Sequence, residues 1–113
     1  MAIKIINLEA GMPTVETARM RLLGELQTAK VTGNRVLKII HGYGSSGKGG
    51  AIKAEVGRIL LQKKREGAIR DFVKGEDFTP FSPNGRRIVA LDSSLGRDRD
   101  YTRGNDGITI VVM

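Results

Sequence analysis

A glycine-rich stretch after a short apolar run holds the residues best suited to chemistry. Residues 36–40 are mostly apolar and end at His41, and residues 42–49 read Gly-Tyr-Gly-Ser-Ser-Gly-Lys-Gly before a helical pattern starts. A strand, a glycine-rich turn and a helix start together aim backbone N–H groups at a phosphate. Four glycines in eight residues cost more backbone entropy than a plain connection requires. We therefore expect residues 42–49 to bind phosphate.

The side chains of this stretch add hydrogen-bond donors and a titratable group. His41 titrates near neutrality, so it can donate to a phosphate or move a proton. Lys48 adds a positive charge, and Ser45 and Ser46 add hydroxyl donors. A histidine at a strand end can also be a hydrogen-bonded structural residue, and both readings of His41 stay open.

Asn7 and Glu9 close the first apolar segment of the chain and join the same candidate site. The carboxyl ends of parallel strands lie side by side at the edge where open α/β sheets bind ligands. Asn7 and Glu9 are two residues apart, so they share a face if the strand continues through them. We expect both to gather with His41 and residues 42–49. The alternative is turn and cap chemistry before a helix at Thr14.

The first half of the chain predicts a strand–helix–strand unit. Residues 2–8 are rich in isoleucine and predict a strand, and residues 36–40 predict a second one that is buried on both faces. Pro13 and Thr14 open a helix between them, and Gly33 ends it. Its apolar face is formed by Val15, Ala18, Leu22, Leu26 and Ala29. The unit is long enough for a right-handed parallel crossover.

The second half predicts another helix, two strands and an irregular insertion. Ile52, Val56, Ile59 and Leu60 mark the helix, which closes on a basic cluster at 62–66. Strands are expected at 68–73 and 108–112. Within the region between them, residues 86–91 favour an extra strand, with a short helix at 88–95 as the alternative. The order predicts an α/β fold in which two helices pack on a small mixed sheet.

Composition favours an anionic partner. The 113 residues make one domain with a formal charge of +7, which attracts DNA or RNA first and an anionic membrane less. Aromatic residues are only 4%, which argues against an aromatic stacking platform. The chain has no cysteine, so it has no disulfide or thiolate site. With no basic leader and no membrane-spanning run, we expect a cytoplasmic protein.

The glycine stretch partly matches the phosphate loop of nucleotide hydrolases. Gly42, Gly47 and Lys48 fit Gly-x-x-x-x-Gly-Lys-Ser/Thr, and residues 88–92 imitate the acidic strand that accompanies it. Gly49 stands where the magnesium-binding hydroxyl belongs, and the loop follows the second strand instead of the first. A mononucleotide site is therefore the weaker alternative.

A second pattern covers nearly the whole chain. Ile39-Ile40-His41-Gly42-Tyr43-Gly44 with Gly47, followed by a helix and the closing segment 104–112, resembles the Smr (small MutS-related) domain, with its His-Gly-x-Gly-x-Gly signature. The third glycine comes one residue later here. The resemblance implies a βαβαββ fold similar to the carboxyl-terminal domain of translation initiation factor three. It also implies nucleic-acid binding, with DNA-nicking or RNA endonuclease activity in many members.

The first strand departs from the family pattern. The Leu-Asp-Leu-His-Gly motif of the family falls on residues 6–11, where Asn7 replaces the aspartate and Glu9 replaces the histidine. An amide cannot act as a general base, so that role is lost at Asn7. Glu9 can take over acid–base work, although its charge repels a phosphate. The insertion at about 76–103 is longer than in a minimal member.

These observations predict a single Smr-like domain over residues 1–113 that contacts the phosphate backbone of nucleic acid and possesses no evident metal or cofactor site. A divalent cation is possible but not indicated. Endonuclease activity stays open, as does a non-catalytic role on a ribosome or another protein. The expected catalytic residues are His41 and Glu9. The expected binding residues are Asn7, Gly42, Tyr43, Gly44, Ser45, Ser46, Gly47, Lys48, Gly49, Lys53 and Arg103.

Overall fold

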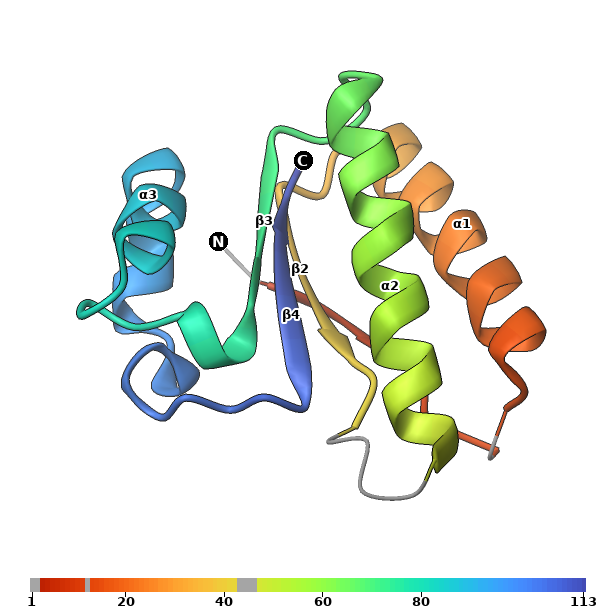
Figure 1. Ribbon diagram of the computed structural model, residues 1–113. Helices are drawn as coiled ribbons and strands as arrows, with labels where there is room; N and C mark the ends of the chain where they lie inside the picture. Colours follow the sequence, from red (N-terminus) through yellow and green to blue (C-terminus); the bar gives the residue numbers. More distant parts are fainter. Residues whose placement is uncertain (1–2, 12, 43–46) are drawn as a thin grey trace.

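The computed structural model of the chain describes residues 3–11, 13–42 and 47–113 (Figure 1). Within these residues it contains four strands, three α-helices and three short 3₁₀ helices. In chain order they are β1 (Lys4–Asn7), α1 (Val15–Thr32), β2 (Val36–Ile40), α2 (Gly47–Arg65), β3 (Asp71–Lys74), η1 (Gly75–Asp77), α3 (Pro83–Leu91), η2 (Ser93–Arg97), η3 (Arg99–Thr102) and β4 (Ile108–Val112).

The four strands form one mixed sheet in the order β1-β2-β4-β3. β1 and β2 run parallel, with Ile6 opposite Ile39, and β4 runs antiparallel to both of its neighbours. The predicted parallel crossover and the α/β fold are therefore confirmed. β2 and β4 occupy the centre, which explains why both are almost wholly apolar.

The ends of α1 follow from local chemistry. Thr14 adopts an extended conformation and its side-chain oxygen accepts a hydrogen bond from the Thr17 N–H, which satisfies a free donor of the first turn. Gly33 ends the helix in the left-handed region at φ 75°. Both predictions are confirmed.

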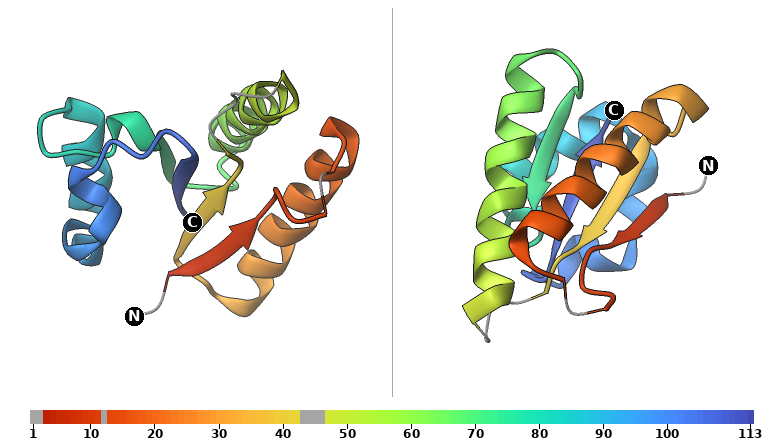
Figure 2. Two further views of the ribbon diagram at one scale, coloured as in Figure 1. Left: turned by 90° about the horizontal axis from the view of Figure 1, so that it is seen from below. Right: turned by 90° about the vertical axis from the view of Figure 1, so that its right-hand side faces the viewer.

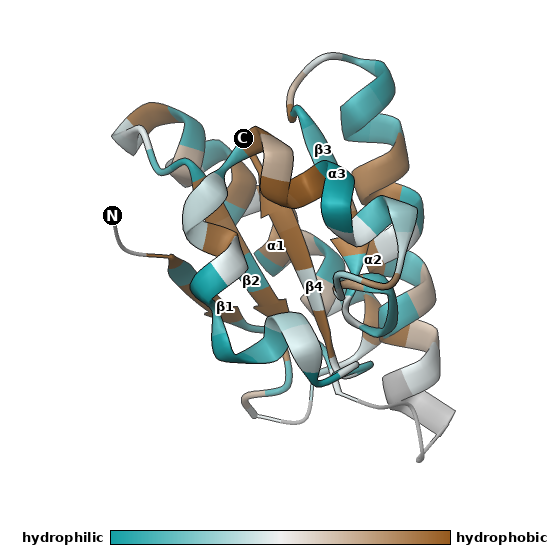
Figure 3. Cartoon of the chain, turned by 90° about the vertical axis from the view of Figure 1, so that its left-hand side faces the viewer, coloured by the Kyte–Doolittle hydropathy of each residue, from teal (hydrophilic) through white to brown (hydrophobic). Residues whose placement is uncertain are grey.

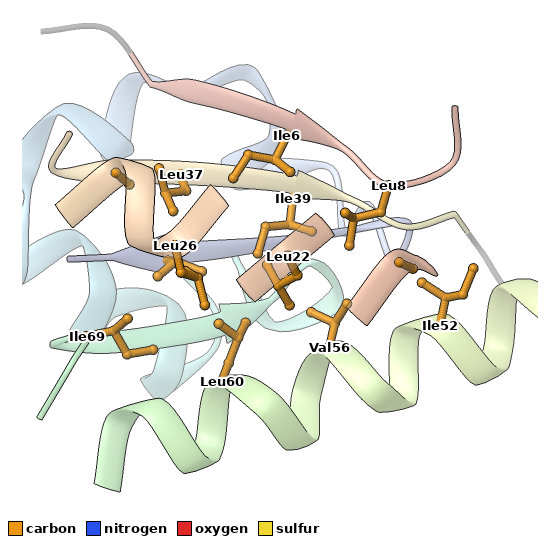
Figure 4. Close-up of a cluster of buried hydrophobic side chains, with 13 residues drawn as sticks. Ile6, Leu8, Leu22, Leu26, Leu37, Ile39, Ile52, Val56, Leu60 and Ile69 are labelled. Carbon is orange, nitrogen blue, oxygen red and sulfur yellow. The ribbon is translucent and has the colours of Figure 1, made fainter. Parts of the chain in front are cut away.

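Helices α1 and α2 cover one face of the sheet, and their apolar stripes meet the strands there (Figures 1 and 4). On the strands, alternate residues point into this core, as the period of two requires. The buried members are Ile6, Leu8, Ala18, Leu22, Leu26, Ala29, Leu37, Ile39, Ile52, Val56, Leu60, Ile69 and Val111.

The opposite face is covered by the insertion, which adds a further layer to the predicted fold (Figure 2). Figure 3 shows apolar residues concentrated on the central strands between these layers. This second core consists of Val36, Val73, Phe78, Ile88, Leu95, Ile108, Ile110 and Val112. The insertion is therefore a helical cover for the sheet and not an irregular excursion.

Three expectations for the chain after β2 were wrong in detail. Residues 86–91 belong to helix α3 and not to an extra strand, because Ser82 caps the helix by accepting from the Gly85 N–H and Pro83 occupies its first turn. The alternative of a short helix was right in type, but the helix spans Pro83–Leu91 instead of 88–95. The third strand is Asp71–Lys74, shifted from the expected 68–73. Residues 47–49 are helical, since α2 already begins at Gly47, so the connection after β2 is shorter than expected.

None of the helices in the described part of the chain combines the length and the apolar composition needed to cross a membrane.

Candidate functional site

The carboxyl ends of β1 and β2 meet at the edge of the sheet where α2 begins. Asn7 lies opposite Ile40, and the Leu8 N–H donates to the Ile40 carbonyl at 2.8 Å. The parallel pairing therefore carries Asn7, Glu9, His41 and Gly42 to the same edge.

His41 is buried at this edge, with 1% of its surface exposed, and both ring nitrogens have partners. Nδ1 lies 3.0 Å from the Gly42 carbonyl oxygen, and Nε2 lies 2.9 Å from the Thr109 hydroxyl on β4. The carbonyl can only accept, so Nδ1 carries the proton. In the neutral ring Nε2 then accepts from the Thr109 hydroxyl.

The surroundings of His41 favour this neutral form. Burial lowers the pKa of His41, the Gly42 carbonyl opposes that shift, and the positive charge of Lys53 adds to it. The imidazole is therefore uncharged near neutral pH, and neither nitrogen is free to bind a substrate in this geometry.

Gly42 has backbone requirements that explain its place after the histidine. Its φ is 84°, a region that side chains disfavour, and its N–H donates to the Gly107 carbonyl at 3.1 Å. A Cβ at this position would lie 2.7 Å from Oε2 of Glu9. Glycine is thus needed both for the turn and for the close approach of the Glu9 carboxylate.

Glu9 and His41 serve opposite faces of the sheet. His41 contacts Thr109, which lies on β4 beside Val111 of the helix-side core. Glu9 instead lines a cleft on the insertion side together with Ile5 and Ile40. The structure therefore does not bring the two residues together as an acid–base pair.

The side chain of Asn7 stabilises the turn that follows β1. Its side-chain oxygen accepts from the Glu9 N–H at 2.8 Å, which closes a short turn after β1. Arg21 of α1 reaches the carbonyl oxygens of Asn7 and Ala10 at 3.5 and 3.2 Å and fixes the same turn from the other side.

Lys53 on α2 forms an ion pair and a hydrogen bond with residues of two other segments. Its ammonium lies 3.0 Å from both carboxylate oxygens of Glu76 and 2.9 Å from the Asp106 carbonyl, so it joins α2 to η1 and to the turn before β4. Arg103 is exposed on the segment between η3 and β4. Of these two cations, Arg103 is the more exposed.

The start of α2 provides the remaining part of the site. Its first turn contains no acidic residue, so the helix itself supplies no carboxylate at the positive end of its dipole. Tyr43, Gly44, Ser45 and Ser46 lie outside the described residues, as do the side chains of residues 47–49.

Sequence reasoning missed the partners that fix this edge. Thr109 is the only polar residue in the otherwise apolar strand β4, and that contrast was a signal for a buried hydrogen bond. Lys38 breaks the apolar strand β2 in the same way and pairs with Asp98 and Asp100. Residues 88–92, expected to imitate the acidic strand of a nucleotide-binding loop, are helical up to Leu91.

Comparison with family models gives a match to the Smr domain over residues 10–77, which is more than half of the chain. The match excludes Asn7 and Glu9, starts at the end of the divergent first-strand motif and stops before α3. Comparisons with curated proteins and with solved structures gave no match. The part of the chain that the structure describes shows no cluster of His, Asp and Glu side chains that could hold a metal ion. By the family match, the chain belongs to the Smr domain family of nucleic-acid-binding and nuclease-like domains.

Proposed function

We propose that this Smr domain binds the phosphate backbone of nucleic acid at the edge of the sheet where α2 begins, and that it does so without cutting the strand. The observation that carries the proposal is the start of α2, whose first turn contains no acidic residue and which lies within the matched family region. Free N–H groups and the helix dipole at such a terminus attract anions.

Three kinds of group would share the binding. Backbone N–H groups of the first turn of α2 would donate to phosphate oxygens, Lys48 would add a point charge, and Arg103 would meet the next phosphate along the strand. Lys53 would act indirectly, because its contact with Glu76 and Asp106 fixes α2 relative to the turn before β4.

His41 would position the binding segment and would not transfer protons. Its contacts with the Gly42 carbonyl and the Thr109 hydroxyl tie the end of β2 to β4. A general acid must offer a proton to its substrate within hydrogen-bond reach, and the single N–H of neutral His41 is used inside the protein.

The binding test measures affinity for single-stranded RNA and DNA against salt concentration. Each phosphate contact contributes about 0.7 to the slope of log K against log salt for a single strand, so Lys48→Ala should reduce the slope by about that amount. Lys30→Ala is the matched control, because Lys30 is exposed in the last turn of α1, at the far end of the molecule (Figure 1).

Absence of binding at low salt would contradict the proposal and favour a protein partner. The binding-only reading is tested by incubating the domain with supercoiled DNA and structured RNA, with and without divalent ions. Cleavage that is lost in His41→Ala, while that variant remains folded, would show that His41 acts in catalysis.

A further inference from the structure

A cleft of about 350 Å³ lies next to Gly42 on the insertion side of the sheet. α3 does not cover this part of the sheet, because β1 is the edge strand farthest from it in the order β1-β2-β4-β3 and α3 packs beside β3. The volume is at the small end of ligand-binding clefts. One wall comes from β1 and β2, and the other from η3 and the turn before β4.

The wall that β1 and β2 form carries two isoleucines beside Lys38. Ile5 on β1 is 60% exposed, although it belongs to a strand whose alternate residues are buried, and Ile40 beside it is only partly buried. A flat apolar group placed over Ile5 and Ile40 would cover surface that now faces water. The exposed guanidinium of Arg99 at the rim supplies a planar cation of the type that stacks on nucleobases.

Glu9 is the carboxylate of the cleft lining that has no cation beside it among the described residues. The other two carboxylates of the lining, Asp98 and Asp100, hold the Lys38 ammonium at 2.8 and 2.7 Å. Glu9 has no ion-pair partner among the described residues, and its Oε2 lies beside Gly42. A carboxylate only accepts hydrogen bonds, so its ligand must present N–H donors.

We propose that the cleft receives an unpaired guanine of the bound strand, with Glu9 accepting from the guanine N1–H and N2 amino group. Two parallel N–H donors match a carboxylate in the same way that an arginine fork does. Gly42 lines the cleft and opens the phosphate-binding segment, so a nucleotide held at α2 has its base within reach. A base-paired guanine cannot use this edge, so the ligand is a single strand or a loop.

This inference rests on the proposed function, but the experiment distinguishes a failure of the base site from a failure of backbone binding. The test compares affinities for short single-stranded oligonucleotides that carry one central guanine, inosine or adenine, at a fixed salt concentration. Inosine keeps N1–H and lacks the N2 amino group. Guanine should bind about tenfold more tightly than adenine, with inosine between them, since a bidentate contact distinguishes bases by about that factor or more.

Glu9→Gln should remove the guanine preference, because an amide offers one acceptor and a competing donor. Its affinity for the adenine oligonucleotide should be equal or higher, because a negative charge beside a polyanion is lost, and the salt slope should not change. Glu66→Gln removes the same charge beyond the far end of α2 and should keep the preference.

Equal affinity of the wild-type protein for all three oligonucleotides would overturn the base site and leave backbone binding intact. A guanine preference that survives in Glu9→Gln, or that persists when the guanine is paired in a hairpin stem, would also overturn it. Loss of all binding at low salt would remove the proposed function itself.

Discussion

The imidazole of His41 is surrounded on both hydrogen-bonding sides by the sheet itself. Nδ1 faces the Gly42 carbonyl and Nε2 faces Thr109, which is 68 residues away in the chain. The residue type is suited to proton transfer, but these contacts use its donor and its acceptor. At the scale of single residues, the surroundings of the side chain decide its role.

A first prediction concerns the pH dependence of folding. The pKa of His41 is lowered in the folded state, mainly by burial, so the unfolded chain binds a proton more readily. The stabilising effect is complete above the unfolded pKa of about 6.5 and is lost as the pH falls below it, with a slope of up to about 1.4 kcal/mol per pH unit. His41 is the only histidine of the chain, so this window belongs to it.

Chemical denaturation between pH 7.5 and 5 measures this effect. The free energy of unfolding of the wild-type protein should decrease over that range, whereas His41→Gln should be less stable at pH 7.5 and nearly independent of pH. A flat wild-type profile would mean that His41 accepts a proton in the folded state without losing its contacts.

The sequence placed His41 and Glu9 at the same edge, and the structure agrees. The two side chains lie on opposite faces because the backbone turns differently after β1 and after β2, and because Thr109 lies beside His41. Such contacts join residues that are distant in the chain, and periodicity carries no information about them. For the same reason the pairing of Lys53 with Glu76 could not be foreseen.

At the scale of elements, β3 is tied to two helices through one carboxylate. Asp71 is buried, and its two oxygens accept from Lys64 at the end of α2 at 2.9 Å and from Arg87 of α3 at 2.7 Å. It also accepts from the Phe72 N–H at 2.8 Å. Burial alone would raise the pKa of Asp71, but these donors together lower it.

Asp71→Asn should therefore destabilise the fold by about 1–2 kcal/mol at pH 7, at the low end for charged hydrogen bonds because Lys64 and Arg87 are partly exposed. A group with a lowered pKa stabilises above its unfolded value of about 3.8, and the effect disappears as the pH falls through the folded pKa.

Thermal unfolding of the two proteins at pH 7 and at pH 2.5 tests this expectation. The difference in melting temperature should be present at pH 7 and smaller at pH 2.5. Glu16→Gln, which removes an exposed helix-surface carboxylate paired with Arg19, is the control and should change the melting temperature far less. An equal effect of both variants would show that the position of Asp71 between elements is unimportant.

Among the elements, α1, β2 and α2 were predictable because their signals are local: a cap, a glycine stop, and apolar periodicity. α3 was expected only as the alternative, a short helix at 88–95, because Ile88-Val89-Ala90-Leu91 suits a strand by propensity. Ser82 and Pro83 are equally local signals for a helix start, and they decide the outcome. Tertiary packing of Ile88 into the second core then stabilises the helix.

At the scale of the molecule, one thin sheet separates two hydrophobic cores that share β2 and β4. Lys38 lies in the middle of β2 and points to the insertion side, where it pairs with Asp98 and Asp100. Asp98, just before η3, and Asp100, within it, thereby attach this part of the insertion to the centre of the sheet. The second core and the cleft beside Gly42 both depend on this attachment.

The final prediction compares two changes to this ion cluster: removal of its cation alone, and replacement of all three charged side chains by neutral ones. Lys38→Met leaves two nearly buried carboxylates without a cation, which should destabilise the protein by about 3–5 kcal/mol. The triple variant Lys38→Met, Asp98→Asn, Asp100→Asn carries no unpaired charge and keeps side-chain oxygens for the Asp100 N–H, so most of the stability should return. Denaturant midpoints of the wild-type protein and the two variants give the comparison.

Because β2 belongs to both cores, hydrogen exchange in Lys38→Met should accelerate at Leu37 and Ile110 together. Acceleration confined to residues 93–107 would instead show that the insertion opens as an independent unit.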